Sequence, residues 1–296
     1  MIAISTSERI LAALRRMLPP PLRGDTPIVP VVRLSGVIGY STPLKPGLTL
    51  SSVARVLERA FTTRKARAVA LSINSPGGSA VQSHLIFKRI RQLAEENEVP
   101  VIAFVEDVAA SGGYMIACAA DEIICDPSSI VGSIGVVGGS FGFDKLIGKI
   151  GIDRRLYTSG DRKVMLDPFL PEKPEDVERL KGVQREIHEG FIQLVQARRT
   201  GKLDGREKAL FSGEFWTGGK ARELGLVDTL GDLRGVLRER YGDKLKTPLI
   251  AERGLLGRRT PGIGGGMIEP LLDRPGLVEE TVSALQARAL WARFGL

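Results

Sequence analysis

The sequence contains few of the residues from which most catalytic and metal sites are built. Its 296 residues include only two histidines, His84 and His188, and only two cysteines, Cys118 and Cys125. Two cysteines in an apolar region provide neither a disulfide framework nor a zinc-binding spacing, so we expect both to be buried free thiols. With so few histidines, a Ser-His-Asp arrangement is difficult to build.

Long apolar runs are absent as well. No segment reaches the roughly 18 uninterrupted apolar residues that indicate a transmembrane helix. Charges interrupt the N-terminus, MIAISTSERILAALRRML, too often for the apolar core of a signal peptide. We expect residues 1–26 to form an amphipathic helix and a Pro-rich linker. This helix either packs on the domain or lies on a membrane surface.

Aromatic residues make up only 5% of the chain, so its core must consist mostly of Val, Ile, Leu and Ala. The composition, 43% hydrophobic and 26% charged, is that of an ordinary globular protein. A net charge of +8 would suit an acidic partner. The basic residues are scattered, however, without a basic stripe interleaved with aromatics, and we expect no nucleic-acid binding.

Apolar strands and helical segments alternate through the first half of the chain. Strands are expected at 66–74, 99–106 and 122–126, at 27–39 with a glycine turn, and at 129–139 as one strand or a pair of strands. Helices are expected at 51–63, 79–95, from 111, at 143–151 and at 175–199. Continuous apolar strands that alternate with helices predict an α/β fold with parallel pairing. We expect a main domain over 27–241 and a C-terminal linker with an amphipathic helix over 242–296.

The stretch VAASGGYMIACAADE, residues 108–122, carries a lone serine, Ser111, among small apolar residues. It follows a predicted strand and opens a predicted helix, whose free N–H groups favour a developing negative charge. Gly112 and Gly113 leave room for a substrate backbone. The alternative is that Ser111 only caps the helix, which is the usual role of serine at this position.

A second glycine pair follows the preceding strand, in Ser75-Pro76-Gly77-Gly78-Ser79. An oxyanion hole needs two N–H donors at a fixed point. Gly78 is our candidate for one donor, with Gly77 less favoured, and Gly112 for the other. The alternative is a plain turn and helix start.

A nucleophilic serine also needs a base. Both histidines lie on predicted helices, where they are best explained as ordinary surface residues. A neutral lysine can replace histidine. The candidate is Lys163 in YTSGDRKVMLDPF, between a strand-like RRLYTSG and an apolar VML. The alternative is a solvated loop lysine.

Five segments in order, SINSPGGS, VAASGGYMIACAADEI, VGSIGV, SGDRKVMLDPF and SGEFWTGGKARELGLVDTLG, resemble the bacterial signal peptide peptidase A family (SppA/SohB-like) of serine proteases. The resemblance covers residues 28–240. It implies a ClpP/crotonase-like fold and a Ser-Lys dyad without metal or cofactor. Ser111 would be the nucleophile, Lys163 the general base, Ser133 the residue that orients the lysine, and Gly78 an oxyanion donor.

The resemblance also implies partners. Members of this family form ring-like homo-oligomers, often octamers, and degrade signal peptides and other unstructured hydrophobic segments. Many members carry a membrane anchor, which we do not find here. The sequence therefore predicts a location in the cytoplasm or at the periphery of the inner membrane.

Two other functions remain open from the sequence. A crotonase-type enzyme acting on acyl-CoA would use the same two N–H donors to hold an enolate, and would not need Ser111. A non-catalytic scaffold or membrane-associated binding protein would not react with serine-directed probes.

Overall fold

The computed structural model describes residues 26–39, 47–160, 162–205, 207–251, 285 and 288–296. Its elements are β1 (Val31–Ser35), α2 (Leu50–Phe61), β2 (Val69–Ser75), α3 (Ala80–Asn97), β3 (Val101–Ala110), α4 (Gly112–Ala117), β4 (Glu122–Cys125), β5 (Ile130–Gly132), α5 (Asp144–Lys149), α6 (Pro174–Arg198), α7 (Glu207–Leu210), β6 (Phe215–Thr217), α8 (Gly218–Glu223), β7 (Thr229–Leu230) and α9 (Leu233–Tyr241). The helix expected within 1–26 lies outside the described residues. The C-terminal helix is described only at 285 and 288–292.

The strands form one sheet, in which β1, β2, β3, β4 and β7 lie side by side in that order with parallel pairing. The strand β3 has two partners along its length. Residues 102–105 pair with β4, and residues 108–110 pair with β5, which in turn pairs antiparallel with β6. The predicted α/β fold with parallel strands is therefore confirmed.

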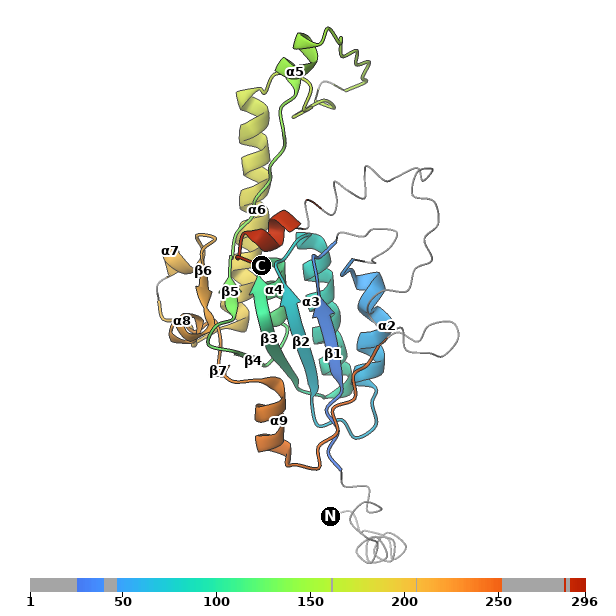
Figure 1. Ribbon diagram of the computed structural model, residues 1–296, viewed down its shortest axis with the longest axis vertical. Helices are drawn as coiled ribbons and strands as arrows, with labels where there is room; N and C mark the ends of the chain where they lie inside the picture. The colour runs from blue at the N-terminus through green and yellow to red at the C-terminus, as the bar shows by residue number, and fades with distance from the viewer. Residues whose placement is uncertain (1–25, 40–46, 161, 206, 252–284, 286–287) are drawn as a thin grey trace, which may run out of the picture.

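Helices α2, α3 and α4 cover one face of this sheet (Figure 1). The helix α3 begins because the Ser79 side chain accepts a hydrogen bond from the Gln82 N–H, at 3.4 Å. Its apolar face, with Ile86, Ile90 and Leu93 buried, packs on the sheet and on its neighbouring helices. Full burial of each such side chain contributes about 1.5–3 kcal/mol.

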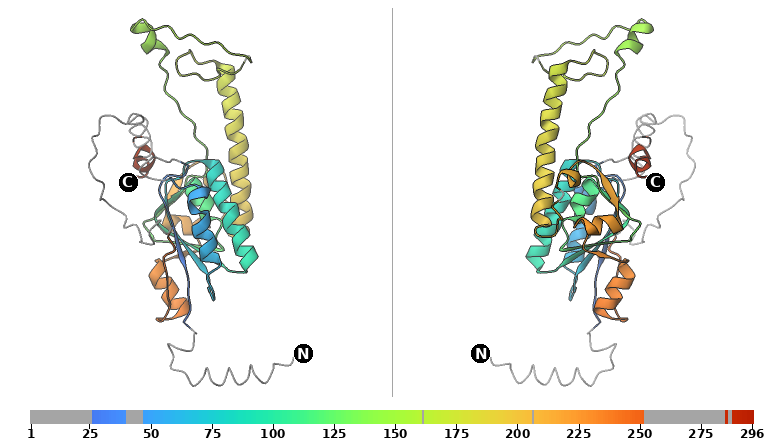
Figure 2. Two further views of the ribbon diagram at one scale, coloured as in Figure 1. Left: turned by 90° about the vertical axis from the view of Figure 1, so that its right-hand side faces the viewer. Right: turned by 90° about the vertical axis from the view of Figure 1, so that its left-hand side faces the viewer.

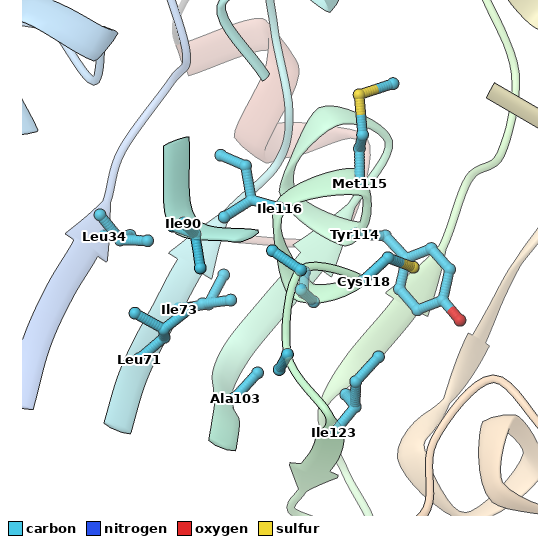
Figure 3. Packing of buried hydrophobic residues seen from close by; sticks show 14 of the residues in the cluster. Leu34, Leu71, Ile73, Ile90, Ala103, Tyr114, Met115, Ile116, Cys118 and Ile123 are labelled. Atoms are coloured by element: carbon cyan, nitrogen blue, oxygen red, sulfur yellow. The ribbon is translucent and has the colours of Figure 1, made fainter. Parts of the chain in front are cut away.

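The short helix α4 is buried over its whole length. Figure 3 shows Ile116 directed toward Ile90 of α3 and Cys118 beside the ring of Tyr114. The Tyr114 hydroxyl donates a hydrogen bond to the Leu226 carbonyl at 2.8 Å, which satisfies its buried polar atom. This packing fixes α4, and with it the position of Ser111 at its start.

The opposite face of the sheet carries α9 and the C-terminal segment, residues 288–296 (Figure 2). A second apolar cluster lies beneath α9, around Phe104, Ile124 and Leu237. The C-terminal segment contributes Phe294, which is 7% exposed and packs on Val108 and Ala110 of β3.

An arm projects from the domain, formed by α5, the loops on either side of it and the N-terminal part of α6 (Figures 1 and 2). The helix α5 has no buried residue, and in α6 only Phe191 and Val195, near its C-terminal end, are buried. Within the described residues, no helix is both long enough and apolar enough to cross a bilayer.

Three sequence-based assignments differ from the structure. The strand expected at 99–106 continues to Ala110, because β5 extends the ladder beyond β4. The strand expected at 129–139 ends at Gly132. The segment RRLYTSG, residues 154–160, forms no strand, because it lies exposed in the arm without a neighbouring strand to pair with.

Candidate active site

Ser111 occupies the junction between β3 and α4. Its backbone has φ 52° and ψ −121°, a conformation that strains a residue with a Cβ atom by about 1–3 kcal/mol. Hydrogen bonds on both sides hold it there: the Ser111 N–H donates to the Gly132 carbonyl at 2.8 Å, and the Ser111 carbonyl accepts from the Met115 N–H at 3.0 Å. Ser111 occupies the N-cap position of α4, but its side chain makes no capping hydrogen bond.

Ser133 directly follows β5, the strand that pairs with the end of β3 beside Ser111. Ala110 is paired with Gly132 in the β3–β5 ladder, so the two serines are the residues that follow this pair. Ser133 also has a positive φ, 53°, and is 5% exposed. Its N–H donates to the Glu214 carbonyl at 2.6 Å, which holds the backbone in place. The structure thus brings Ser111 and Ser133 together.

The glycine pair after β2 faces the same junction. Gly77 and Gly78 have φ of 100° and 140°, which only glycine adopts readily. A Cβ on Gly77 would lie 2.8 Å from the Ser111 Cβ, and one on Gly78 would lie 2.1 Å from the Ile38 carbonyl oxygen. Both positions therefore exclude a side chain, and the loop lies directly against Ser111.

The N–H groups of this region differ in whether they have a partner. The Gly77 N–H donates to the Ser75 hydroxyl at 3.3 Å. Two backbone hydrogen bonds join Ile38 to the residues on either side of Gly78. The Ile38 N–H donates to the Gly77 carbonyl, and the Ser79 N–H donates to the Ile38 carbonyl, each at 2.8 Å. The Gly78 N–H thus points to the other side and has no acceptor among the described residues. The same holds for the N–H of Gly112, the first residue of α4.

Ser111, Gly78 and Gly112 all line one cavity of about 420 Å³. Beyond these polar groups the cavity is largely apolar, with walls formed by Met115, Val136, Val137, Ile187, Phe191 and Leu290. The arrangement therefore offers a hydroxyl and two backbone donors at one end and an apolar recess beside them. A carbonyl group with an apolar side chain is the kind of group that suits such a site.

Lys163 does not line this cavity. It is exposed, in a turn of the arm where its N–H donates to the Gly160 carbonyl at 3.2 Å. The arm extends away from the sheet and from α4 (Figures 1 and 2). Within one chain, the structure therefore does not bring Lys163 to Ser111.

The two histidines are not placed at the cavity either. His84 lies on α3 beside Phe87, with the two ring centroids 6.2 Å apart. His188 lies on α6, with its Nε2 3.1 Å from the Ile134 carbonyl oxygen. Neither is among the residues that line the cavity with Ser111.

Both cysteines are buried and free, as expected from the sequence. Burial raises the pKa of the Cys118 thiol to about 12, and it also raises the pKa of the Cys125 thiol to about 12. Since the thiolate is the nucleophilic form, neither cysteine is a candidate nucleophile at neutral pH.

The C-terminal segment also reaches the cavity. Leu290 and Arg293 line the cavity, and Phe294 anchors the segment with its ring edge-on to Phe215 at 5.1 Å between centroids. The apolar spacing of this segment indicated a helix. Its docking site could not be read from the sequence, because the strands that bind it lie far earlier in the chain.

Family models match two overlapping parts of the chain. The model described as peptidase family S49 matches residues 94–244. The model described as the N-terminal domain of NfeD1b matches residues 40–144. The first of these covers the segments that carry Ser111, Ser133 and Lys163.

Several curated proteins are similar to this chain. A Brucella abortus protein named Na(+)/H(+) antiporter NhaA is 57% identical over 96% of this chain, but the chain covers only 39% of that protein, so the name describes a much longer molecule. The putative protease slr0021 of Synechocystis is 31% identical over 79% of this chain and 86% of its own length. The chloroplastic serine protease SPPA of Arabidopsis thaliana is 33% identical over 72% of this chain and 32% of its own length.

Among solved structures, a mutant of the 1510-N membrane-bound stomatin-specific protease matches with a TM-score of 0.47 and 18% identity, over 76% of this chain and 93% of that one. The family match over residues 94–244 and the relatives named as proteases agree. On this basis the chain belongs to peptidase family S49.

Proposed function

We propose that this chain is a serine protease, in which Ser111 is the nucleophile and Gly78 and Gly112 donate the hydrogen bonds to the oxyanion. One observation carries the proposal: a strained serine without a side-chain cap shares a cavity with two backbone N–H groups that have no acceptor in the part of the chain that the structure describes. Backbone strain at a serine whose side chain does not cap the following helix is typical of functional positions. Unpartnered donors beside a nucleophile are what the tetrahedral intermediate of acyl transfer requires.

We further propose that the general base is Lys163 of a neighbouring copy in a ring-like homo-oligomer. The arm holds Lys163 away from the Ser111 of its own chain, so a second copy is needed to complete the dyad. Exposed apolar side chains on the arm support this assembly, since Phe141, Ile150 and Tyr157 are 78%, 61% and 92% exposed. Apolar surface of this kind commonly marks a protein interface.

The chemistry then proceeds without a metal. The Lys163 amine of the neighbouring copy takes the proton from the Ser111 hydroxyl, while Ser133 orients the amine. The alkoxide attacks a peptide carbonyl, and the N–H groups of Gly78 and Gly112 hold the oxyanion. The lysine then protonates the leaving amine, and water hydrolyses the acyl-enzyme to regenerate Ser111.

The cavity supports unstructured apolar segments, including cleaved signal peptides, as substrates. Met115, Val136 and Phe191 offer an apolar recess beside Ser111. A folded protein cannot present its backbone to this recess, whereas an extended chain can. We place the protein in the cytoplasm or at the periphery of the inner membrane, where a net charge of +8 favours contact with an anionic surface.

The first test is cleavage of an unfolded, apolar fluorogenic peptide by the wild type and by Ser111→Ala. We expect the wild type to cleave and the variant to be inactive. If both cleave at the same rate, Ser111 is not the nucleophile.

The second test addresses the shared dyad. Ser111→Ala and Lys163→Ala should each be inactive alone. When equal amounts are unfolded and refolded together, random mixing should restore about a quarter of the wild-type rate, because one site in four pairs an intact serine with an intact lysine. A dyad within one chain predicts no recovery, and that result would overturn the shared site.

A further inference from the structure

We infer that Ser75 is a positioning residue for the oxyanion site, which it shapes by contacting both backbone segments that supply the donors. The inference rests on the proposed roles of Gly78 and Gly112. Ser75 is the last residue of β2 and is 0% exposed. It does not line the cavity, so it cannot touch the substrate.

The Ser75 hydroxyl fixes the loop that carries Gly78. It donates a hydrogen bond to the Gly36 carbonyl at 2.7 Å and accepts one from the Gly77 N–H at 3.3 Å. The turn after β1 is thereby tied to the loop after β2, one residue before the proposed donor. Since the Gly77 N–H is engaged in this way, the peptide that follows it is held with the Gly78 N–H free.

The backbone and Cβ of Ser75 support the segment that carries the other proposed donor, Gly112. A Cβ on Gly113 would lie 2.5 Å from the Ser75 carbonyl oxygen and 3.2 Å from the Ser75 Cβ. The first turn of α4, which begins with Gly112, therefore packs directly on the backbone of Ser75. One buried residue thus sets the separation between the segments of Gly78 and Gly112.

The strand geometry explains why a hydroxyl is needed here. The register between β2 and β3 shifts between Ile73 and Ser75, and Ser75 then pairs with Ala109. At this irregularity the chain leaves the regular ladder with β3, and the backbone hydrogen bonds that remain in the loop run to Ile38 on its other side. The Ser75 hydroxyl supplies two bonds where the ladder ends.

The test is Ser75→Ala in the full-length protein, assayed with the apolar fluorogenic peptide. A misplaced oxyanion donor weakens binding of the transition state and leaves binding of the substrate unchanged. We therefore expect kcat to fall by about tenfold to a hundredfold with KM unchanged. A wild-type kcat, or a loss confined to KM, would overturn the inference.

A matched control comes from the same strand. Ser72 is also buried and its hydroxyl donates to Glu106 Oε1 at 2.6 Å, away from the cavity. Ser72→Ala removes an equivalent hydroxyl and should leave kcat at the wild-type value. If Ser72→Ala reduced kcat as much as Ser75→Ala, the effect would be a general loss of strand stability, and the positioning role would fall.

A binding measurement separates positioning from stability. Ser111 adds reversibly to a peptide aldehyde to form a hemiacetal, whose oxygen occupies the oxyanion position. Ser75→Ala should weaken binding of the aldehyde by the same factor by which it lowers kcat, while a product peptide binds as before.

Should Ser75→Ala fail to fold, Ser75→Cys fills the same space with a weaker acceptor, and we expect the same changes in kcat and aldehyde binding. If Ser111→Ala is inactive and the Ser75 variant is fully active, only the role of Ser75 is rejected. If Ser111→Ala is active, the proposed site itself is rejected.

Discussion

Ser111 and Ser133 follow paired residues of adjacent strands, and both adopt a positive φ, 52° and 53°. A glycine would occupy such a conformation without strain. A serine occupies position 111 although its side chain does not cap the following helix, which is expected where the hydroxyl has a chemical role. The sequence pointed to Ser111 through its small neighbours, but not to its backbone angles, because these depend on the pairing of β3 with a distant β5.

Stability measurements can detect the strain at Ser111 independently of activity. Ser111→Gly and Ser111→Ala should both be inactive, but the glycine variant should be more stable than the alanine variant by about 1 kcal/mol, because φ 52° favours glycine. Thermal unfolding of the two variants at equal concentration measures this difference. Equal stabilities would show that the backbone at Ser111 relaxes without cost.

Gly78 should tolerate alanine much less well than Gly36 does. Both have positive φ, 140° and 107°, but a Cβ would lie 2.1 Å from the Ile38 carbonyl oxygen at Gly78 and would meet nothing within 4 Å at Gly36. Gly36→Ala should lose about 1–2 kcal/mol from the backbone conformation alone. Gly78→Ala should lose more, and its kcat should fall by at least about a hundredfold. Similar activities of the two variants would remove Gly78 from the proposed site.

At the scale of the elements, the central α/β unit was predictable because its signals are local. The apolar runs of β2 and β3 and the Ser79 cap of α3 can be read from neighbouring residues alone. What could not be predicted depends on distant partners: the extension of β3 to Ala110, the early end of β5, and the docking of Phe294. The glycine loops were correctly expected at the ends of adjacent strands, since parallel strands end at the same edge.

The end of α6 is joined to the loop before β7 by a buried ion pair. Arg199, 3% exposed, donates to Asp228 Oδ2 at 2.7 Å and twice to the Gly225 carbonyl, at 2.9 and 2.7 Å. Burial alone would raise the pKa of Asp228, but hydrogen bonds from Arg199, Lys202 and the Ile123 N–H outweigh it and hold this pKa below its ordinary value.

This lowered pKa predicts a loss of stability in acid. A carboxylate whose pKa is depressed by folding stabilises the protein above its unfolded pKa, near 3.9, and the contribution is lost as the pH falls through the folded value. Asp228→Asn should lose about 3 kcal/mol at pH 7, because Arg199 is left buried and unpaired, and its stability should depend less on pH below about 4. Denaturant unfolding from pH 7 to pH 3 measures both effects. Asp153→Asn, on the exposed arm, is the control, and its stability should match that of the wild type at each pH. A similar loss of stability in Asp153→Asn would contradict the role given to the Arg199–Asp228 ion pair.

At the scale of the whole molecule, the dominant feature is the arm, whose apolar side chains face solvent in the single chain. Ile150→Asp should abolish both assembly and peptide cleavage, because Ile150 is 61% exposed at the end of α5 and a charge would oppose its burial between copies. Leu249→Asp makes the same change at a residue that is 51% exposed on the body and should leave both unchanged. Light scattering combined with the peptide assay measures the two properties together. An Ile150→Asp protein that is monomeric and fully active would exclude a site shared between copies.

The position of Lys163 on the arm also has a consequence for newly made chains. If nucleophile and base meet only between copies, a single chain emerging from the ribosome carries a complete set of residues but no working site. Proteolysis would then begin only once the local concentration of chains passes an assembly threshold. Dilution alone would silence the enzyme without any inhibitor, and the rate per chain would rise with concentration until every arm is occupied.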